Sequence, residues 1–345
     1  MIKSFLFFIY IIIRLNLNKM TLDLDLPWVE KYRPKNFEDI VSQNIAVNNI
    51  KEFVLKGNDM PHIIFTGPAG TGKTSTALII ARYFFKGENY YRNVLELNAS
   101  DSVRMDFIRD VIKDFVNQEM IISENNLKIV ILDEADNIPN QVQQALRRII
   151  EITSSRVKFI LLCNYLDKII DPIISRCAVF RFVDLTKEKV VERLQYIAQR
   201  ENLKIPKKDE SKFFETLYFI SGGDLRKAIN TFQMAVALDL IENLNVNEIL
   251  KITGFIDEET LDKLRNAFKT KNLTKTKEIL DSIENFDSRN LIKQILELSS
   301  ELDLTNENRN SLIEFIGEVD YRISQGADDK IQLIALFADI IEKLK

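Results

Sequence analysis

The residues with the clearest chemical meaning form one glycine-rich loop. They read Gly67-Pro68-Ala69-Gly70-Thr71-Gly72-Lys73-Thr74 and fit the pattern G-x-x-x-x-G-K-[ST] at every fixed position. In such a loop the backbone N–H groups surround a polyphosphate, the lysine reaches the β- and γ-phosphates, and the last hydroxyl binds Mg²⁺. The alternative is a glycine-rich turn that only resembles a phosphate loop. We expect a site for a polyphosphate ligand with Mg²⁺ that comprises Gly67, Pro68, Ala69, Gly70, Thr71, Gly72, Lys73, Thr74 and Ser75.

A second group of reactive residues follows an apolar run that begins at Lys128. The run ends in Asp133-Glu134-Ala135-Asp136. A carboxylate at the end of a strand beside a phosphate loop holds Mg²⁺ through water, and this role falls to Asp133. Glu134 is placed to polarise the attacking water as a general base. Because binding without turnover does not need Glu134, the pair predicts hydrolysis of the bound polyphosphate.

The segments around these residues predict the elements that position them. His62–Thr66 reads as a buried strand before the loop, and Thr74–Phe85 reads as a helix after it. From about Leu26 to Asp184, short apolar runs alternate with amphipathic stretches, which predicts an α/β fold with a five-stranded parallel sheet covered by helices on both faces. The expected strands are His62–Thr66, Val94–Leu97, Ile129–Leu132, Phe159–Cys163 and Val179–Phe182.

The second half of the chain has a different pattern. Helical spacing continues through Thr186–Arg200, Phe213–Ile220 and Leu225–Leu240, and no strand pattern follows Val246. We therefore predict four segments: an upstream extension at residues 1–19, a nucleotide-binding domain at 20–184, a helical lid at 185–247 and a helical collar at 248–345. The collar has more apolar residues than one small bundle needs, which predicts packing between copies. These residues are Leu312, Ile313, Phe315 and Ile316, followed by Ile331, Leu333, Ile334 and Leu336.

Composition excludes several other kinds of site. The chain has 345 residues, too many for one core of ordinary size, and a net charge of −4, so any contact with DNA must use a local basic patch. Two cysteines, Cys163 and Cys177, and one histidine exclude a disulfide framework and a zinc site of several Cys and His ligands. A Ser-His-Asp triad would need His62, which we interpret as structural because it begins an apolar strand.

The first residues of the chain are unusual. The apolar run from Phe5 to Ile13 is shorter than the roughly 20 residues of a membrane span, and it lacks the basic start and the cleavage site of a signal peptide. We interpret Met20 as the start of translation. A peripheral membrane anchor is the minority interpretation.

The chain resembles the small subunit of replication factor C, the AAA+ sliding-clamp loader, most closely its archaeal type. The resemblance extends from about Leu26 to the C-terminus, and its motifs occur in the family's order and spacing. Besides the loop and the Asp-Glu-Ala-Asp sequence, they are Pro27-Trp28-Val29-Glu30-Lys31-Tyr32-Arg33-Pro34, Leu95-Glu96-Leu97-Asn98-Ala99-Ser100-Asp101, Cys163-Asn164-Tyr165, Ser175-Arg176-Cys177 and Gly223-Asp224-Leu225-Arg226.

The resemblance implies three further catalytic residues. Asn164 corresponds to the first sensor, an amide for the γ-phosphate or the attacking water, although a strand-end asparagine can also simply cap a turn. Arg226 corresponds to the second sensor, on the helical lid, and a solvated surface arginine is the alternative. Arg176 corresponds to an arginine finger that acts in trans, in the neighbouring subunit's ATP site. A structural arginine paired with an acidic neighbour is the alternative for Arg176.

The resemblance also implies an adenine pocket and a control on the catalytic carboxylate. A polar residue such as Asn98 holds the catalytic glutamate inactive until DNA binds in related AAA+ proteins. The adenine pocket is implied to include Val29, Tyr32, Arg33, Ile40 and Val41.

The sequence departs from the family pattern after Asp101. The family usually continues Glu-Arg-Gly-Ile, and here the residues are Ser102-Val103-Arg104-Met105. Phosphate tracking needs cations without base readout, so Arg104, Arg109 and Lys113 remain candidates for DNA contacts. The alternative is a solvated charged helix face.

The function implied by the resemblance is ATP-driven loading of a ring-shaped clamp onto primer–template DNA during replication. The implied partners are a replication factor C large subunit and other small subunits in a heteropentamer, the sliding clamp and DNA, with no membrane. The implied location is the cytoplasm, or the nucleus in a eukaryote. Two alternatives are another AAA+ DNA remodeller, which typically ends in a winged-helix module with strands, and a nucleotide-bound structural subunit without turnover. The helical tail argues against the first alternative. The presence of Glu134, Asn164, Arg176 and Arg226 argues against the second.

Overall fold

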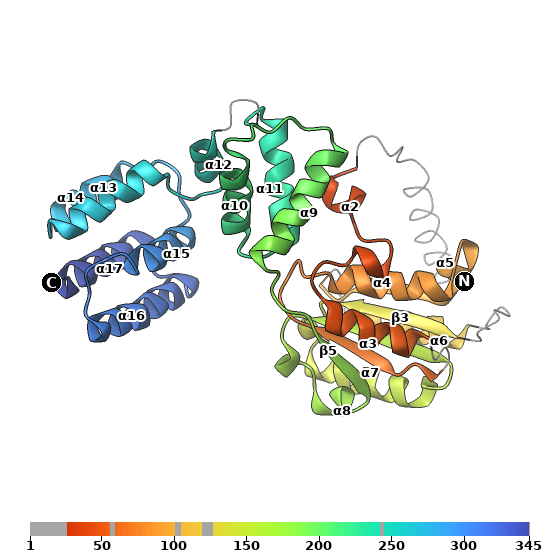
Figure 1. Ribbon diagram of the computed structural model, residues 1–345. Coiled ribbons are helices and arrows are strands. Elements are labelled where there is room, and N and C mark those ends of the chain that lie inside the picture. Colours follow the sequence, from red (N-terminus) through yellow and green to blue (C-terminus); the bar gives the residue numbers. More distant parts are fainter. Residues whose placement is uncertain (1–25, 56–58, 101–104, 119–126, 242–244, 345) are drawn as a thin grey trace. The chain divides into compact units, whose positions relative to one another are not determined.

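The computed structural model describes residues 26–55, 59–100, 105–118, 127–241 and 245–344 (Figure 1). The upstream extension at 1–19 lies outside these residues. The chain divides into two compact units. The first comprises the described residues up to Leu203 together with Ser221–Phe232, and the second comprises Lys204–Ile220 together with the described residues from Gln233 onward.

A parallel sheet forms the centre of the first unit. Its five strands lie in the order β2-β3-β4-β1-β5, and every neighbouring pair is parallel, as the sequence predicts. The carboxyl ends of the strands therefore meet at one edge of the sheet, where ligands bind in open α/β folds. The strands are β1 (His62–Thr66), β2 (Val94–Asn98), β3 (Lys128–Asp133), β4 (Val157–Cys163) and β5 (Cys177–Arg181).

Helices cover both faces of this sheet (Figure 1). Successive side chains of a strand point to opposite faces, so an apolar run can be buried along its whole length. Ile63 and Phe65 pack with α3 and α4, whereas Ile64 packs with α6, α7 and α8. The helices of this unit are α2 (Trp28–Lys31), α3 (Asn44–Val54), α4 (Lys73–Phe84), α5 (Glu88–Asn93), α6 (Met105–Asn117), α7 (Asn140–Thr153), α8 (Asp171–Ile174), α9 (Lys187–Arg200) and the first part of α11 (Leu225–Ala237).

Short 3-10 turns connect these elements. They are η1 (Phe37–Asp39), η3 (Ala135–Asn137) and η4 (Leu166–Lys168). The turns η3 and η4 follow β3 and β4 at the carboxyl edge of the sheet, so they lie where the sequence predicts the reactive residues.

The second unit contains only helices among its described residues, as predicted. They are α10 (Glu210–Ser221), the end of α11, α12 (Val246–Ile252), α13 (Glu258–Lys269), α14 (Leu273–Asp281), α15 (Ser288–Ser299), α16 (Asn306–Ser324) and α17 (Asp329–Lys343). Side-chain caps at Asp257, Asn272, Asp287, Thr305 and Asp328 accept backbone N–H groups and begin α13 to α17. The helices bury a core that includes Leu264, Phe268, Leu291, Leu312 and Phe337.

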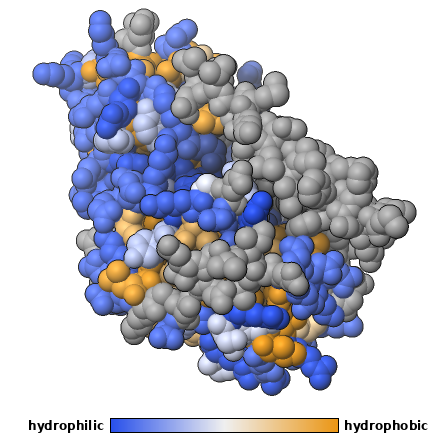
Figure 2. Space-filling view, turned by 90° about the vertical axis from the view of Figure 1, so that its right-hand side faces the viewer, coloured by the Kyte–Doolittle hydropathy of each residue, from blue (hydrophilic) through white to orange (hydrophobic). Residues whose placement is uncertain are grey.

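No helix of the described residues is long and apolar enough to cross a membrane. Figure 2 shows one face of the molecule, on which hydrophobic residues form separate patches among hydrophilic ones.

Candidate functional site

The glycine-rich loop has the geometry that its sequence predicts. It follows β1 directly, and α4 begins at Lys73, so the N-terminus of α4 and its free N–H groups point into the loop. The N-terminus of a helix and an adjacent run of backbone N–H groups attract anions. The local geometry therefore fits a polyphosphate.

Two glycines of the loop have no room for a side chain. A Cβ atom on Gly67 would lie 2.1 Å from the backbone oxygen of Phe182. A Cβ atom on Gly70 would lie 1.8 Å from the Asp224 Oδ1 atom, and the φ angle of Gly70 is +71°. Both glycines let another chain segment approach the loop backbone closely.

Lys73 is buried beside the loop and makes three hydrogen bonds. Its ammonium group donates to the backbone oxygens of Gly67 and Pro68 at 2.6 and 2.7 Å, and to Asn164 Oδ1 at 3.0 Å. Burial lowers the pKa of Lys73, and the nearby charge of Asp133 opposes this effect. The structure therefore brings Lys73 together with Asn164, which comes from the end of β4.

The predicted metal ligands also meet. The Thr74 hydroxyl donates to Asp133 Oδ2 at 2.9 Å, although β4 separates β3 from β1 in the sheet. Hydroxyl and carboxylate oxygens are ligands that suit Mg²⁺. The donor set thus fits the cation that the sequence predicts.

Glu134 has a backbone conformation that is rare for a non-glycine residue. Its φ angle is +55°, in the left-handed region, where functional residues often concentrate. Its carboxylate accepts hydrogen bonds from the Ser100 hydroxyl and, at 3.2 Å, from Asn137 Nδ2. Among the described residues, no hydrogen bond joins the side chains of Asn98 and Glu134. Its Oδ1 atom accepts the Ser100 N–H at 2.9 Å, so Asn98 holds the residue that binds Glu134.

Asp136 holds the segment that contains Asn164. Its Oδ2 atom accepts the backbone N–H groups of Asn164 and Tyr165, both at 3.2 Å. Gln143 on α7 also helps to hold this region, since its side chain forms hydrogen bonds with the backbone of Ile138, Lys168 and Ile170. The sequence did not single out Asn137 or Gln143 and gave Ser100 only as part of a family motif, because hydrogen bonds between distant segments leave no local pattern.

Asp224 connects Arg226 to the loop, because it caps the start of α11 and also lies against Gly70. Asp224 Oδ1 accepts the N–H groups of Arg226 and Lys227 at 2.8 and 3.1 Å, and the same oxygen lies against Gly70. Burial is the main cause of the lowered pKa of Lys73, and the positive charge of Arg226 adds to it. Arg226 itself is exposed, with its charge within electrostatic reach of Lys73.

Arg176 lies at the amino ends of the strands, opposite the end that carries the glycine-rich loop. The register pairs Cys177 with His62, so Arg176 precedes β5 beside the start of β1, whereas the loop follows the end of β1. Five residues of strand separate the two positions by roughly 16 Å. The Arg176 guanidinium forms an ion pair with Glu151 at 2.6 Å. The structure therefore does not place Arg176 in its own chain's phosphate site.

The residues implied for an adenine pocket occupy three different environments. Ile40 is buried and lies 3.7 Å from the position of a Cβ atom on Gly72, so it borders the loop. The Tyr32 hydroxyl binds Glu201, and burial is the main cause of its raised pKa. Val29 and Val41 are half-buried.

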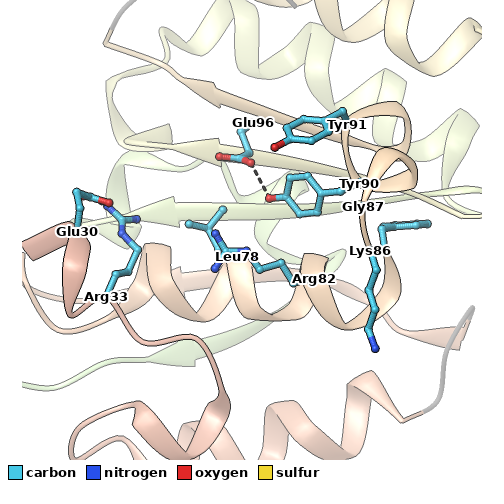
Figure 3. Close-up of a pocket in the computed structure, with 10 residues that line it drawn as sticks. Glu30, Arg33, Leu78, Arg82, Lys86, Gly87, Tyr90, Tyr91 and Glu96 are labelled. Carbon is cyan, nitrogen blue, oxygen red and sulfur yellow. Dashed lines mark hydrogen bonds and ion pairs between the residues drawn. The ribbon is translucent and has the colours of Figure 1, made fainter. Parts of the chain in front are cut away.

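Arg33 points toward Glu30 and forms an ion pair with it (Figure 3). It lines a cavity of about 670 Å³ along α4 and α5, together with Leu78, Arg82, Lys86, Tyr90 and Glu96. None of the loop residues lines this cavity. The side chain of Arg33 therefore contacts Glu30 and borders this cavity.

The candidate DNA contacts are only partly described. Arg104 lies outside the described residues, and Arg109 is described only as part of the backbone of α6. Lys113, on the same helix, is exposed. Within the described part of the chain, no group of three or more His, Cys, Asp or Glu residues is arranged to hold a metal ion.

Comparison with known proteins identifies the family. Residues 63–185 match the family described as ATPase family associated with various cellular activities (AAA), and residues 256–339 match the replication factor C C-terminal domain. The replication factor C small subunit of Saccharolobus solfataricus is 42% identical over 91% of this chain and 94% of its own length. The chain belongs to the replication factor C small subunit family. It is therefore an AAA+ ATPase of the clamp-loader class.

Other relatives agree with this assignment. The replication factor C small subunit of Aeropyrum pernix is 42% identical over 91% of this chain and 95% of its own length. That of Archaeoglobus fulgidus is 39% identical over 90% and 96%. The Thermotoga maritima RuvB Holliday junction branch migration motor is only 17% identical, with a TM-score of 0.50 over 76% of this chain and 91% of its own. The likeness to RuvB supports the AAA+ fold alone.

Proposed function

We propose that this chain binds ATP with Mg²⁺ at its glycine-rich loop and hydrolyses it to drive the loading of a sliding clamp onto primer–template DNA. The hydrogen-bonded group of Lys73, Asn164, Thr74 and Asp133 is the observation that carries the proposal. These residues come from three separate segments and converge at the carboxyl edge of the sheet.

Each residue has a separate role in this proposal. Lys73 exchanges its bonds to the loop carbonyls for bonds to the β- and γ-phosphates. Thr74 and Asp133 hold Mg²⁺, which neutralises charge on the phosphates when bound. Glu134 orients and deprotonates the attacking water, and Asn164 donates to that water or to the γ-phosphate.

The hydrogen bond between Ser100 and Glu134 suggests how the site is kept inactive. A carboxylate that accepts hydrogen bonds from a hydroxyl group and an amide group is less available to a water molecule. Release of Glu134 from Ser100 would let it act as a base. The chain continues from Ser100 through Arg104 to α6, which carries Arg109 and Lys113, and these three residues are the proposed DNA contacts. We therefore propose that DNA binding and release of Glu134 are linked along one stretch of chain.

The proposed partners are a large subunit and further small subunits in a heteropentamer, the clamp and primed DNA, in the cytoplasm. In this proposal, subunits must assemble because Arg176 completes an ATP site of another subunit. It lies away from its own loop, and we assign it to the ATP site of the neighbouring subunit, together with the lid residue Arg226 of that subunit's own chain. A cation at the γ-phosphate stabilises charge in the transition state.

The division of roles between Lys73 and Glu134 is tested by two substitutions. Lys73→Ala removes a contact to ground-state phosphates and should weaken ATP binding. Glu134→Gln preserves shape and should leave ATP binding intact, while hydrolysis slows by about a hundredfold or more, the usual effect of losing a general base. ATP affinity by calorimetry and single-turnover hydrolysis separate the two effects. An equal loss of ATP affinity in both variants contradicts the assignment.

A further inference from the structure

The ion pair of Arg176 is part of a larger cluster formed by α7 and the residues that follow α8. Glu151 forms an ion pair with Arg176 Nη2 at 2.6 Å and accepts a hydrogen bond from Arg147 Nε at 2.9 Å. The side chains of Glu151 and Arg176 are each 35% exposed, so the cluster is accessible from solvent. A neighbouring subunit can therefore reach it without local unfolding.

The guanidinium group of Arg176 is held on two sides. Nη2 is bound by Glu151 from α7, and Nη1 donates to the Pro172 carbonyl at 2.5 Å and to the Ser175 hydroxyl at 3.3 Å. A long arginine side chain has many rotamers, and each contact reduces the entropy that it must lose when it meets a phosphate. A cation that is oriented before the reaction also needs less reorganisation in the transition state. The contacts thus fix the direction of Arg176 in advance.

The charges of the cluster leave it able to attract an anion. The hydrogen bond from Arg147 is the main cause of the lowered pKa of Glu151, and the charges of Arg176 and Arg148 act in the same direction. Glu151 is therefore ionised at neutral pH. Three guanidinium groups against one carboxylate leave two positive charges (3 − 1 = 2). Glu151 orients the arginine without cancelling the charge of the cluster.

We propose that Glu151 is a positioning residue that presents Arg176 to the γ-phosphate bound by the neighbouring subunit. The inference rests on the proposed role of Arg176 in trans. An exposed ion pair contributes little to stability, so a purely structural Glu151 would affect neither turnover nor folding much. A positioning role is thus visible in the kinetics of the assembled complex and not in the melting temperature.

Glu151→Gln in the complete complex with clamp and primed DNA tests the proposal. The variant keeps the size of the side chain and loses the charge. We expect kcat for ATP to fall about tenfold, a fraction of what an arginine finger supplies. KM for ATP should stay as in the wild type, because Arg176 is proposed to act on charge that develops in the transition state. The melting temperature should also stay unchanged, because an exposed ion pair contributes little to stability. Glu192→Gln is the matched control, since Glu192 pairs with Lys189 at 2.7 Å on the exposed face of α9, and it should leave kcat unchanged.

The double variant shows whether Glu151 acts through Arg176. If it does, Arg176→Ala and Arg176→Ala with Glu151→Gln should have the same kcat. A further loss in the double variant, or a wild-type kcat in Glu151→Gln alone, overturns the proposal. The trans role itself is judged separately, by whether mixed complexes of Lys73→Ala and Arg176→Ala chains regain activity. If mixing restores activity and Glu151→Gln behaves as wild type, only the positioning role fails.

Discussion

At the scale of single residues, His62 illustrates a chemically versatile side chain with a structural role. It is 6% exposed, and its Nδ1 atom accepts the backbone N–H of Phe159 at 3.1 Å. Burial, with a smaller contribution from the charge of Lys158, lowers the pKa of His62 to about 4. The neutral imidazole therefore bridges β1 and β4 and supports the sheet, as the sequence predicts.

The lowered pKa of His62 predicts a pH dependence of stability. The unfolded chain takes up a proton near the ordinary pKa of 6.5, whereas the folded chain resists protonation until about pH 4. The contribution is present above pH 6.5 and is lost as the pH falls through this window. By pH 5 the loss should reach about 2 kcal/mol.

His62→Asn keeps a hydrogen-bond acceptor and removes the titration. Urea unfolding of both proteins at pH 7.5 and pH 5 measures the difference. The wild type should lose more stability between these pH values than the variant does. Parallel losses in the two proteins would show that His62 is not buried in its neutral form.

The residues of the phosphate site could be predicted to different degrees. Lys73, Thr74 and Asp133 follow from fixed spacing within short motifs, because phosphate chemistry demands those residue types in that order. Asn137 and Gln143 were not predicted, and Ser100 appeared only within a family motif, since their contacts with each other or with distant segments leave no local pattern. Tyr32 and Arg33 were implied as adenine contacts by resemblance alone, yet their side chains bind Glu201 and Glu30.

At the scale of elements, the glycine-rich loop and the cap of α11 are packed directly against each other. Gly70 leaves room for Asp224, and Asp224 caps α11 through the N–H groups of Arg226 and Lys227. The close contact fixes where α11 begins relative to the loop. It also determines how far the start of α11, with Arg226, lies from the loop.

Gly70→Ala should disrupt the contact between the loop and Asp224. The new methyl group would overlap Asp224 Oδ1 and add strain at a positive φ angle. We expect ATP affinity to fall at least about tenfold, which corresponds to roughly 1.4 kcal/mol. Gly87→Ala is the matched control. Gly87 has a φ angle of +59° and no atom within 4 Å of its Cβ position, so this variant should lose some stability and no ATP affinity. Equal ATP affinity in the two variants would refute the role of the contact.

Element boundaries follow the sequence closely, while neighbour relations do not. The predicted helix Thr74–Phe85 and the observed α4 differ by one residue at each end, because apolar periodicity and glycine breaks are local signals. The place of β4 between β3 and β1 depends on long-range pairing. The contact between Asn164 and Lys73 was therefore an implication of resemblance and not of the pattern.

At the scale of the whole molecule, the C-terminal helices are proposed to join subunits. Of the apolar residues that the sequence assigned to contacts between copies, Leu312, Ile316, Leu333 and Leu336 are buried in the core of their own unit. The expectation of a large apolar surplus was wrong for these positions. Ile313 and Ile331 remain 46% and 64% exposed and are the candidates for such contacts. The three-domain division at residues 184 and 247 stays a prediction.

Ile331→Glu should weaken assembly. A charge buried between subunits without a partner costs several kcal/mol, on the order of 3 kcal/mol. Analytical ultracentrifugation should show smaller complexes, while ATP affinity of the single chain stays unchanged. Leu55→Glu is the control, because Leu55 is 69% exposed and lies at the end of α3, outside the C-terminal helices. Normal assembly of Ile331→Glu would show that this face of α17 is not an interface.

The central claim is that each ATP site is built from two chains, with Lys73 and Glu134 from one and Arg176 from its neighbour. The most direct test is the DNA-stimulated ATPase rate of complexes that contain Lys73→Ala and Arg176→Ala chains in equal amounts. Each variant alone should be nearly inactive. With random order, about one interface in four joins an intact Lys73 to an intact Arg176, so roughly a quarter of the wild-type rate should return. If mixed complexes form and no activity returns, Arg176 does not act across the subunit boundary.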